Sequence, residues 1–137
     1  MVDYGPFTMT LQSAPVVACA AGVDASGRYV VAPFAGKVTA AGVICATAIT
    51  GAATDSRTIQ LHNRVAGSGT TLVASKAFVS SVNAAADAVT ALTLTATAAD
   101  LVVAEGDILE FTSLHVGSTG LAGPEFVGTV TFQRAVA

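Results

Sequence analysis

The chain is predicted to fold as an all-β protein, an antiparallel, jelly-roll-like β-sandwich with an extended N-terminal arm. Three observations support this fold class. Roughly eight or nine short strand-like runs recur at a spacing of about 8–12 residues, with turn residues between them. The runs are rich in Val and Thr, which favour strands. Helical periodicity is almost absent, and only residues 80–88 could form a short helical turn or a loop.

The first 15 residues are predicted to form the arm, because Gly5-Pro6 and Pro15 interrupt regular structure. Within the arm, residues 7–11 alternate between apolar and polar side chains. This pattern predicts a short strand, either at a sheet edge or crossing to a neighbouring molecule. Residues 16–137 then form a single sandwich domain, which is long enough to bury one core.

Two stretches, residues 29–43 and 101–114, each read as a strand, a tight glycine turn and a second strand. Pro33 lacks an N–H group, so we expect it at a strand end or a bulge. Gly36 is expected to supply a positive φ in the first turn. Gly42 marks a possible bulge in the long strand that follows.

Residues 57–65 show the most regular alternation in the chain. Ile59, Leu61 and Val65 are predicted to face the core. Arg57 lies on the same face of the strand and is predicted to mark the point where this face passes out of the core. The opposite, polar face consists of Thr58, Gln60, His62 and Arg64. Further strands are predicted at residues 70–79, 89–97 and 126–133.

The composition is short of charge. Hydrophobic residues make up 53% of the chain, whereas aromatic residues make up 6% and charged residues 11%. An ordinary soluble domain has about 25% charged residues. A monomer with so little charge tends to associate, because charge keeps surfaces apart. We therefore expect much of the surface to be buried in a permanent homo-oligomer or in a protein coat.

Charge and hydropathy also argue against several classes of protein. The net charge is −3 and the six Lys and Arg residues are scattered, so no basic stripe predicts nucleic-acid binding. The uncharged run at residues 38–54 contains four threonines and is shorter than the usual ~20 apolar residues of a membrane span. The first 12 residues lack the basic and apolar regions of a signal peptide.

No motif predicts catalysis, a cofactor or a metal. His62 and His115 are expected to be solvated or satisfied, and Ser113 near His115 lacks a surrounding G-x-S-x-G motif. Glu105, Asp107 and Glu110 form an acidic trio around a turn, but without the spacing of a Ca²⁺ loop. The two cysteines, Cys19 and Cys45, are predicted to be buried free thiols, with a disulfide between neighbouring strands as the alternative.

A family resemblance adds to these predictions. The segments VAPFAGKV (residues 31–38) and VAEGDI (residues 103–108), with the alternating strand at 58–65 and a terminal strand, resemble small head proteins of tailed bacteriophages. These decoration, or cement, proteins are similarly rich in Ala, Thr, Val and Gly. The resemblance implies a non-enzymatic virion protein that sits as a homo-oligomer, most often a trimer, on the outer capsid and clamps subunits of the major capsid protein.

If this resemblance holds, we expect the arm to bind the capsid or a sister subunit by adding a strand to an exposed sheet edge. Its large side chains, Tyr4, Phe7, Met9 and Leu11, are the predicted partner-binding residues. The alternative function is a carbohydrate- or receptor-binding β-sandwich of a phage fibre or tail. Sugar sites usually use exposed aromatic rings, and the chain has no Trp and two Tyr. A tail-tube subunit ranks third, and an enzyme ranks last.

Overall fold

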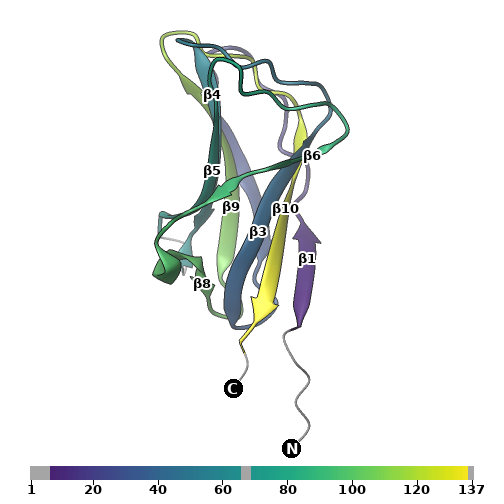
Figure 1. Cartoon of the computed structure of the whole chain (residues 1–137), viewed down its shortest axis with the longest axis vertical. Helices are drawn as coiled ribbons and strands as arrows, with labels where there is room; N and C mark the ends of the chain where they lie inside the picture. The colour runs from purple at the N-terminus through teal and green to yellow at the C-terminus, as the bar shows by residue number, and fades with distance from the viewer. Residues whose placement is uncertain (1–6, 66–68, 136–137) are drawn as a thin grey trace, which may run out of the picture.

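The computed structural model describes residues 7–65 and 69–135. It is 55% strand and 4% helix, and its strands form two antiparallel sheets packed face to face. In Figure 1, strands β4, β5 and β9 lie to the left of β3, β10 and β1. The predicted all-β antiparallel sandwich is confirmed.

The first sheet has the order β1-β10-β3-β6, with β8 also paired to β3, and the second has the order β2-β9-β4-β5-β7. The strands are β1 (Thr8–Gln12), β2 (Ala25–Val31), β3 (Gly36–Cys45), β4 (Ser56–Asn63), β5 (Thr71–Phe78), β6 (Val89–Ala91), β7 (Thr93–Leu94), β8 (Val102–Val103), β9 (Ile108–Val116) and β10 (Phe126–Arg134). A 3-10 turn, η1 (Ala98–Leu101), precedes β8, and among the described residues no helix could span a membrane.

The strands pair in a nested pattern. The first strand pairs with the last, β2 pairs with β9, β3 pairs with β8, and β4 pairs with β5. Two further pairings, β10 with β3 and β9 with β4, join these pairs into sheets. Successive strands therefore alternate between the two sheets until β4 and β5, which form a hairpin within one sheet.

The two glycine turns singled out in the sequence lie side by side. The N–H of Ala32 donates to the carbonyl of Asp107 (2.8 Å), and the N–H of Gly106 donates to the carbonyl of Ala32 (2.9 Å). Gly106 has a φ of +88°, which a side chain would strain. The prediction for Gly36 was wrong in its reason. Its φ is not positive, and glycine is needed there because a Cβ would collide with the carbonyl of Gln133.

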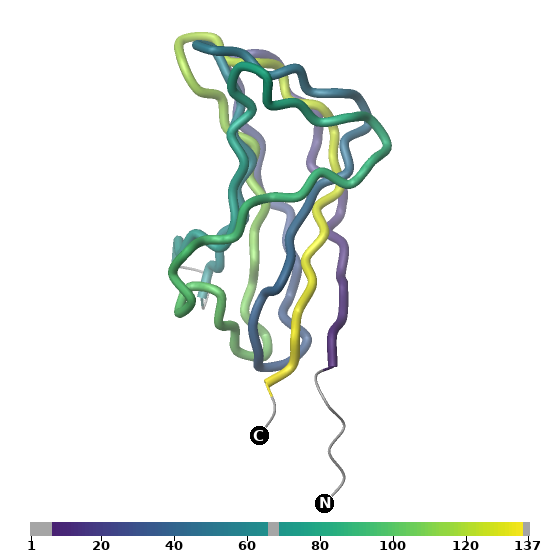
Figure 2. The backbone as a smooth tube through the Cα atoms, viewed as in Figure 1, coloured from purple at the N-terminus to yellow at the C-terminus, as the bar shows by residue number. Residues whose placement is uncertain are grey.

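The core lies between the inner faces of the two sheets. Phe111 of β9 and Phe126 of β10 meet edge to face, with ring centroids 6.3 Å apart. Both are at most 1% exposed, and burying such a side chain contributes about 1.5–3 kcal/mol. Gly128 lies against the Phe111 ring, which leaves no room for a Cβ. Leu92, between β6 and β7, is also buried where the chain passes from one sheet to the other, as the green tube in Figure 2 shows.

Strand β4 corrects two predictions. Arg57 does not leave the core, because it is 0% exposed. Val65 does not face the core, because the strand ends at Asn63 and Val65 is 48% exposed. The inward face is completed by Asn63 instead. The bulge expected at Gly42 is also misplaced. Thr131 pairs with Ala40 and Phe132 pairs with Val38, so the extra residue of β3 is Thr39.

The described part of the predicted arm belongs to the sandwich. Strand β1 is the edge strand of the first sheet, as the alternation allowed, and pairs with β10 of the same chain. Beyond it, Val16 forms an isolated bridge to Phe126, the first residue of β10, and Cys19 forms one to Gly123, just before that strand. Residues 8–12 are therefore an edge strand of the sandwich, which is one of the two alternatives predicted for this stretch. Residues 1–6 lie outside the described part.

Candidate interaction surface

The outer face of the first sheet carries almost no charge. Its strands contain two charged residues, Lys37 and Arg134, and both lie toward the end at which the chain termini lie. Most of the other outward side chains on β1, β3 and β10 are hydroxyl, amide or small groups. We call the following set the threonine face: Thr8, Thr10, Gln12, Thr39, Ala40, Thr129 and Thr131.

Cross-strand contacts order the threonine face. The Oγ1 atoms of Thr10 and Thr131 lie 2.8 Å apart, and Thr39 Oγ1 donates to the carbonyl of Thr131 at 3.4 Å. The register places Thr10, Thr131 and Ala40 in one row across three strands. Cross-strand threonine pairs of this kind stabilise a sheet. The face is therefore a regular, uncharged and preordered surface.

Apolar side chains extend this surface on the flank opposite β1. Val89 on β6 is 67% exposed and Val102 on β8 is 61% exposed, although both belong to strands. The centres of protein interfaces are depleted of charge in the same way. The face is chemically suited to lie against another protein.

The predicted partner-binding residues differ in how exposed the structure leaves them. Tyr4 lies outside the described residues. Phe7 is 49% exposed, and its ring meets Phe34 edge-on with centroids 5.8 Å apart. Met9 is half-buried, and Leu11 packs against the core. The structure thus turns the apolar side of β1 inward and leaves Thr8, Thr10 and Gln12 exposed. Sequence reasoning missed these polar residues, although their period-two spacing in strands 8–12 and 126–134 was a usable signal.

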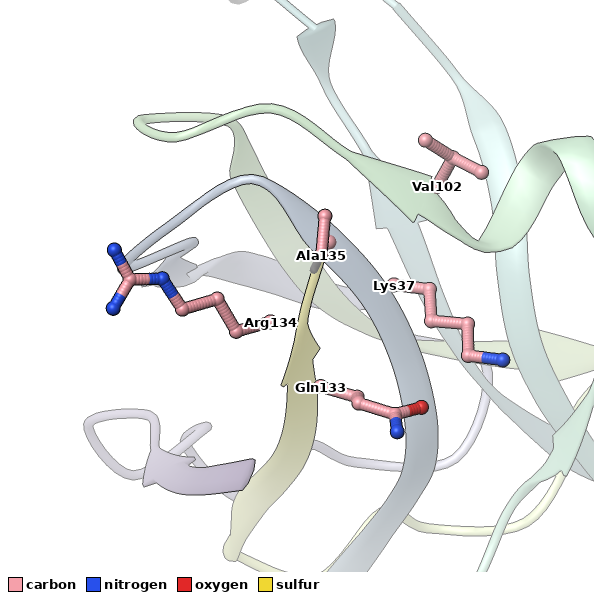
Figure 3. A pocket seen from close by; sticks show the side chains of 6 residues that line it. Lys37, Val102, Gln133, Arg134 and Ala135 are labelled. Atoms are coloured by element: carbon pink, nitrogen blue, oxygen red, sulfur yellow. The ribbon is translucent and has the colours of Figure 1, made fainter. Parts of the chain in front are cut away.

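A shallow hollow of about 400 Å³ lies at the lower end of this sheet, lined by Gly36, Lys37, Val102, Gln133, Arg134 and Ala135. Figure 3 shows the Lys37 and Arg134 side chains pointing away from each other. Two cations that diverge cannot hold one anion between them. The hollow has no convergent polar groups of the kind that small-ligand sites need.

The outer face of the second sheet has a different chemistry. Glu110 on β9 is 8% exposed, accepts a hydrogen bond from the Gly27 N–H (3.1 Å) and lies 3.7 Å from Arg64. Its cross-strand neighbours are His62 and Tyr29, and Tyr29 is 52% exposed. Burial lowers the pKa of His62, as does the positive charge of Arg64, whereas Glu110 acts in the opposite direction.

His115 and Ser113 do not form a catalytic pair. Asp24 Oδ1 accepts from the backbone N–H of His115 (2.8 Å) and lies 2.7 Å from its ring Nδ1. These bonds, first the backbone and then the side-chain one, hold the pKa of Asp24 below its usual value. Ser113 is buried and its Oγ accepts a hydrogen bond from Arg57. Asp24 therefore ties a loop to β9, and Ser113 is part of the interior.

The acidic trio is dispersed among separate partners. Asp107 accepts from Asn63 (3.0 Å) and from the Ala104 N–H (2.9 Å), Glu110 pairs as described above, and Glu105 is exposed. Across the described residues, no group of three or more His, Cys, Asp or Glu side chains is placed to hold a metal.

Both cysteines are free thiols. Cys45 is buried as predicted, and burial raises the pKa of its thiol. The prediction for Cys19 was wrong in one respect, because Cys19 is only half-buried.

Arg57 clamps the loops at one end of the sandwich. Its guanidinium donates to the carbonyls of Leu121 (2.8 Å) and Val23 (3.0 Å), and more weakly to that of Ala20 (3.5 Å). It also donates to Ser113 Oγ (3.0 Å). A buried charge is costly unless it is hydrogen-bonded, and these four acceptors give each of the three guanidinium nitrogens a partner. Its role is structural: it joins residues 20–23 and 121 to β4.

Comparisons with models of protein families, with curated proteins and with solved structures found no match to this chain.

Proposed function

We propose that the chain is a non-enzymatic structural protein of a virion, a decoration or cement protein on the outer capsid surface. In this role it forms a homo-oligomer, a trimer in the family it resembles, and binds the shell of major capsid protein. The binding stabilises the shell by clamping neighbouring subunits.

The strand order supports this proposal. The nested pairing of β1 with β10, β2 with β9, β3 with β8 and β4 with β5 supports assigning the sandwich a jelly-roll connectivity. Jelly rolls occur in viral capsid and lectin domains. Fold alone does not assign a function, so the surface has to carry the argument.

The threonine face is the observation that carries the proposal. It is uncharged over most of its area, ordered by cross-strand contacts, and flanked by Val89 and Val102, which are 67% and 61% exposed. A coat-reinforcing protein needs repeated shape complementarity and gains affinity from many copies bound at once. A regular, charge-poor sheet face meets that need.

Purified virus particles from the source of this chain provide the test. We expect the chain to co-purify with the particles, and its removal by mild denaturant to lower the temperature at which the shells open. Adding back the purified chain should restore that temperature. Absence from the particles, or shells equally stable without it, would contradict the proposal.

One observation favours the alternative, a carbohydrate- or receptor-binding module. Tyr29 is 52% exposed beside Glu110, on the face that also carries His62 and Arg64. An aromatic ring next to hydrogen-bonding groups is a common feature of sugar sites. A glycan array with the wild type and a Tyr29→Ala variant tests this. Binding that the variant loses would favour the alternative over capsid decoration.

A further inference from the structure

Within the described residues the two sheets have four outer edges, and three of them carry features that discourage pairing with another chain. Strands β6 and β8, at one edge of the first sheet, have three and two residues, and β7, at an edge of the second, has two. Strand β2, at the other edge of the second sheet, carries Arg28 and a register irregularity between Ala25 and Arg28. Short strands, charges and bulges are the usual devices that prevent edge-to-edge association.

Strand β1, at the fourth edge, has none of these devices. Its sequence is TMTLQ, without charge or proline, and its register with β10 is unbroken over all five residues. The Arg134 N–H donates to the carbonyl of Phe7 (2.8 Å) and the Ser13 N–H to that of Gly128 (2.9 Å), so odd-numbered residues bond to β10. In an antiparallel ladder, the intervening residues direct their backbone groups away. Thr8, Thr10 and Gln12 therefore present open donors and acceptors along this edge.

We propose that β1 pairs antiparallel with β1 of a second copy of this chain, about a two-fold axis through Thr10. This inference deepens the proposed function by naming the contact between copies. The axis places Thr10 opposite its own copy and Thr8 opposite Gln12 of the other copy. All of these residues have outward backbone groups, so they match as hydrogen-bonded pairs and exchange roughly six bonds.

The side chains match about the same axis. On one side, the exposed hydroxyls of Thr10 from both copies meet and extend the row that already contains Thr131. On the other side, half-buried Met9 lies opposite half-buried Leu11 of the other copy. Polar groups thus face polar groups and apolar groups face apolar groups, which a one-residue slip would destroy.

Charge favours a second copy as the occupant of this edge. The chain has a net charge of −3, so most approaches between two copies are repulsive. Strand β1 has no charged residue, and the charged residues within the first sheet, Lys37 and Arg134, are basic. The described acidic side chains lie in loops, turns, η1 and the second sheet. Two copies meeting at β1 keep those carboxylates apart.

The proposal differs from a trimer in a measurable way. A two-fold contact uses the same patch on both subunits and closes a dimer, whereas a three-fold ring needs two different patches. A dimer has twice the chain mass of 13.5 kDa and a trimer has three times that mass. A trimer that does not depend on β1 would overturn this inference and leave the proposed capsid role intact.

Crosslinking tests the pairing directly. In a Cys19→Ser background, Thr10→Cys would place two thiols opposite each other, with Cβ atoms about 5 Å apart. We expect a short bis-maleimide to convert most of this variant to a covalent dimer. Thr39→Cys is the matched control, because Thr39 is also exposed on the threonine face but belongs to the inner strand β3. Equal crosslinking of the two variants, or none of Thr10→Cys, would overturn the proposal.

Solution mass provides the second measurement. Thr10→Lys places a charge next to its own copy at the axis. Light scattering should therefore show that the solution mass falls from that of a dimer to that of a monomer. Thr39→Lys should keep the wild-type mass. A monomeric wild type, or a Thr10→Lys variant with an unchanged oligomer, would contradict β1 pairing. Pairing of β1 with an extended segment of another protein would show as a monomeric wild type that the capsid shell still binds.

Discussion

The two ends of the sandwich are held together by different kinds of bonds. At the upper end in Figure 1, the long loops are fixed by side chains, as where Arg57 binds the carbonyls of Leu121 and Val23. Asp55 Oδ1 likewise accepts from the Thr119 N–H (3.2 Å). At the lower end, the adjacent turns at residues 32–35 and 104–107 are joined mainly by backbone hydrogen bonds.

This difference follows from loop length. A short turn satisfies its backbone groups within itself or against its neighbour. A long loop leaves carbonyl and N–H groups without a ladder, and they still need partners where they are buried. A few polar side chains supply those partners at the upper end. Single substitutions should therefore cost more there than at the lower end.

The largest effect is expected from Arg57→Met. The substitution keeps a long apolar stem but leaves buried carbonyls without donors, so the free energy of unfolding should fall by about 3 kcal/mol. Urea denaturation measures this change. Arg28→Met is the control, because Arg28 also donates to carbonyls, those of Pro15 and Gly27, but lies at a half-exposed edge. If both variants lose the same free energy of unfolding, the buried Arg57 contacts stabilise the fold no more than the half-exposed Arg28 contacts do.

Two glycines with similar φ angles sharpen the comparison. Gly117 at the upper end has a φ of +92°, and Gly106 at the lower end has a φ of +88°. A Cβ on Gly106 would meet nothing within 4 Å, so Gly106→Ala should cost about 1 kcal/mol from backbone strain alone. A Cβ on Gly117 would collide with Asp55 Oδ1 and lie 3.1 Å from the carbonyl of Thr54.

Gly117→Ala should therefore cost about 2–3 kcal/mol, the strain plus the displaced Asp55 contacts. Thermal denaturation of both variants provides the comparison. If the two alanine variants melt at the same temperature, the close contact of Gly117 with Asp55 does not add to the cost of its substitution.

Acid should produce the smallest loss of stability, and this loss should come from carboxylates at the upper end. Backbone N–H groups hold the pKa of Asp24 and Asp55 below the usual 3.8. A carboxylate with a lowered pKa stabilises the fold above its unfolded pKa, and this contribution is lost as the pH falls through the folded value. The melting temperature should therefore drop below about pH 4. An Asp24→Asn, Asp55→Asn variant should show a smaller drop between pH 5 and pH 3, and an unchanged drop would assign acid sensitivity elsewhere.

The sequence was sufficient for the fold class because alternation and turn residues are local signals. It identified β4 and β5 closely, and it singled out the two stretches whose turns the structure places side by side. It failed at Arg57, although the residue shares the parity of Ile59 and Leu61. The alternation itself predicted an inward side chain, and the expectation that charge avoids the core overrode it.

The interaction surface was harder to predict, because it depends on which strands become neighbours. Thr10 and Thr131 are 121 positions apart, and nothing local indicates that they touch. For the same reason, the pattern at residues 7–11 could predict a strand but not its partner. That β1 pairs with β10 of its own chain becomes visible only in the folded structure.

The nested strand order has a kinetic consequence. Strand β10 lies between β1 and β3, yet of the described strands it is the last to be synthesised. Until then, the first sheet has a gap one strand wide, bordered by β1 and β3, which are synthesised much earlier. Contacts between such distant segments form slowly, and unpaired strands expose the chain to aggregation in the meantime. The waiting time for β10 thus sets a period in which a nascent chain is vulnerable, and premature termination before residue 126 would make that state permanent.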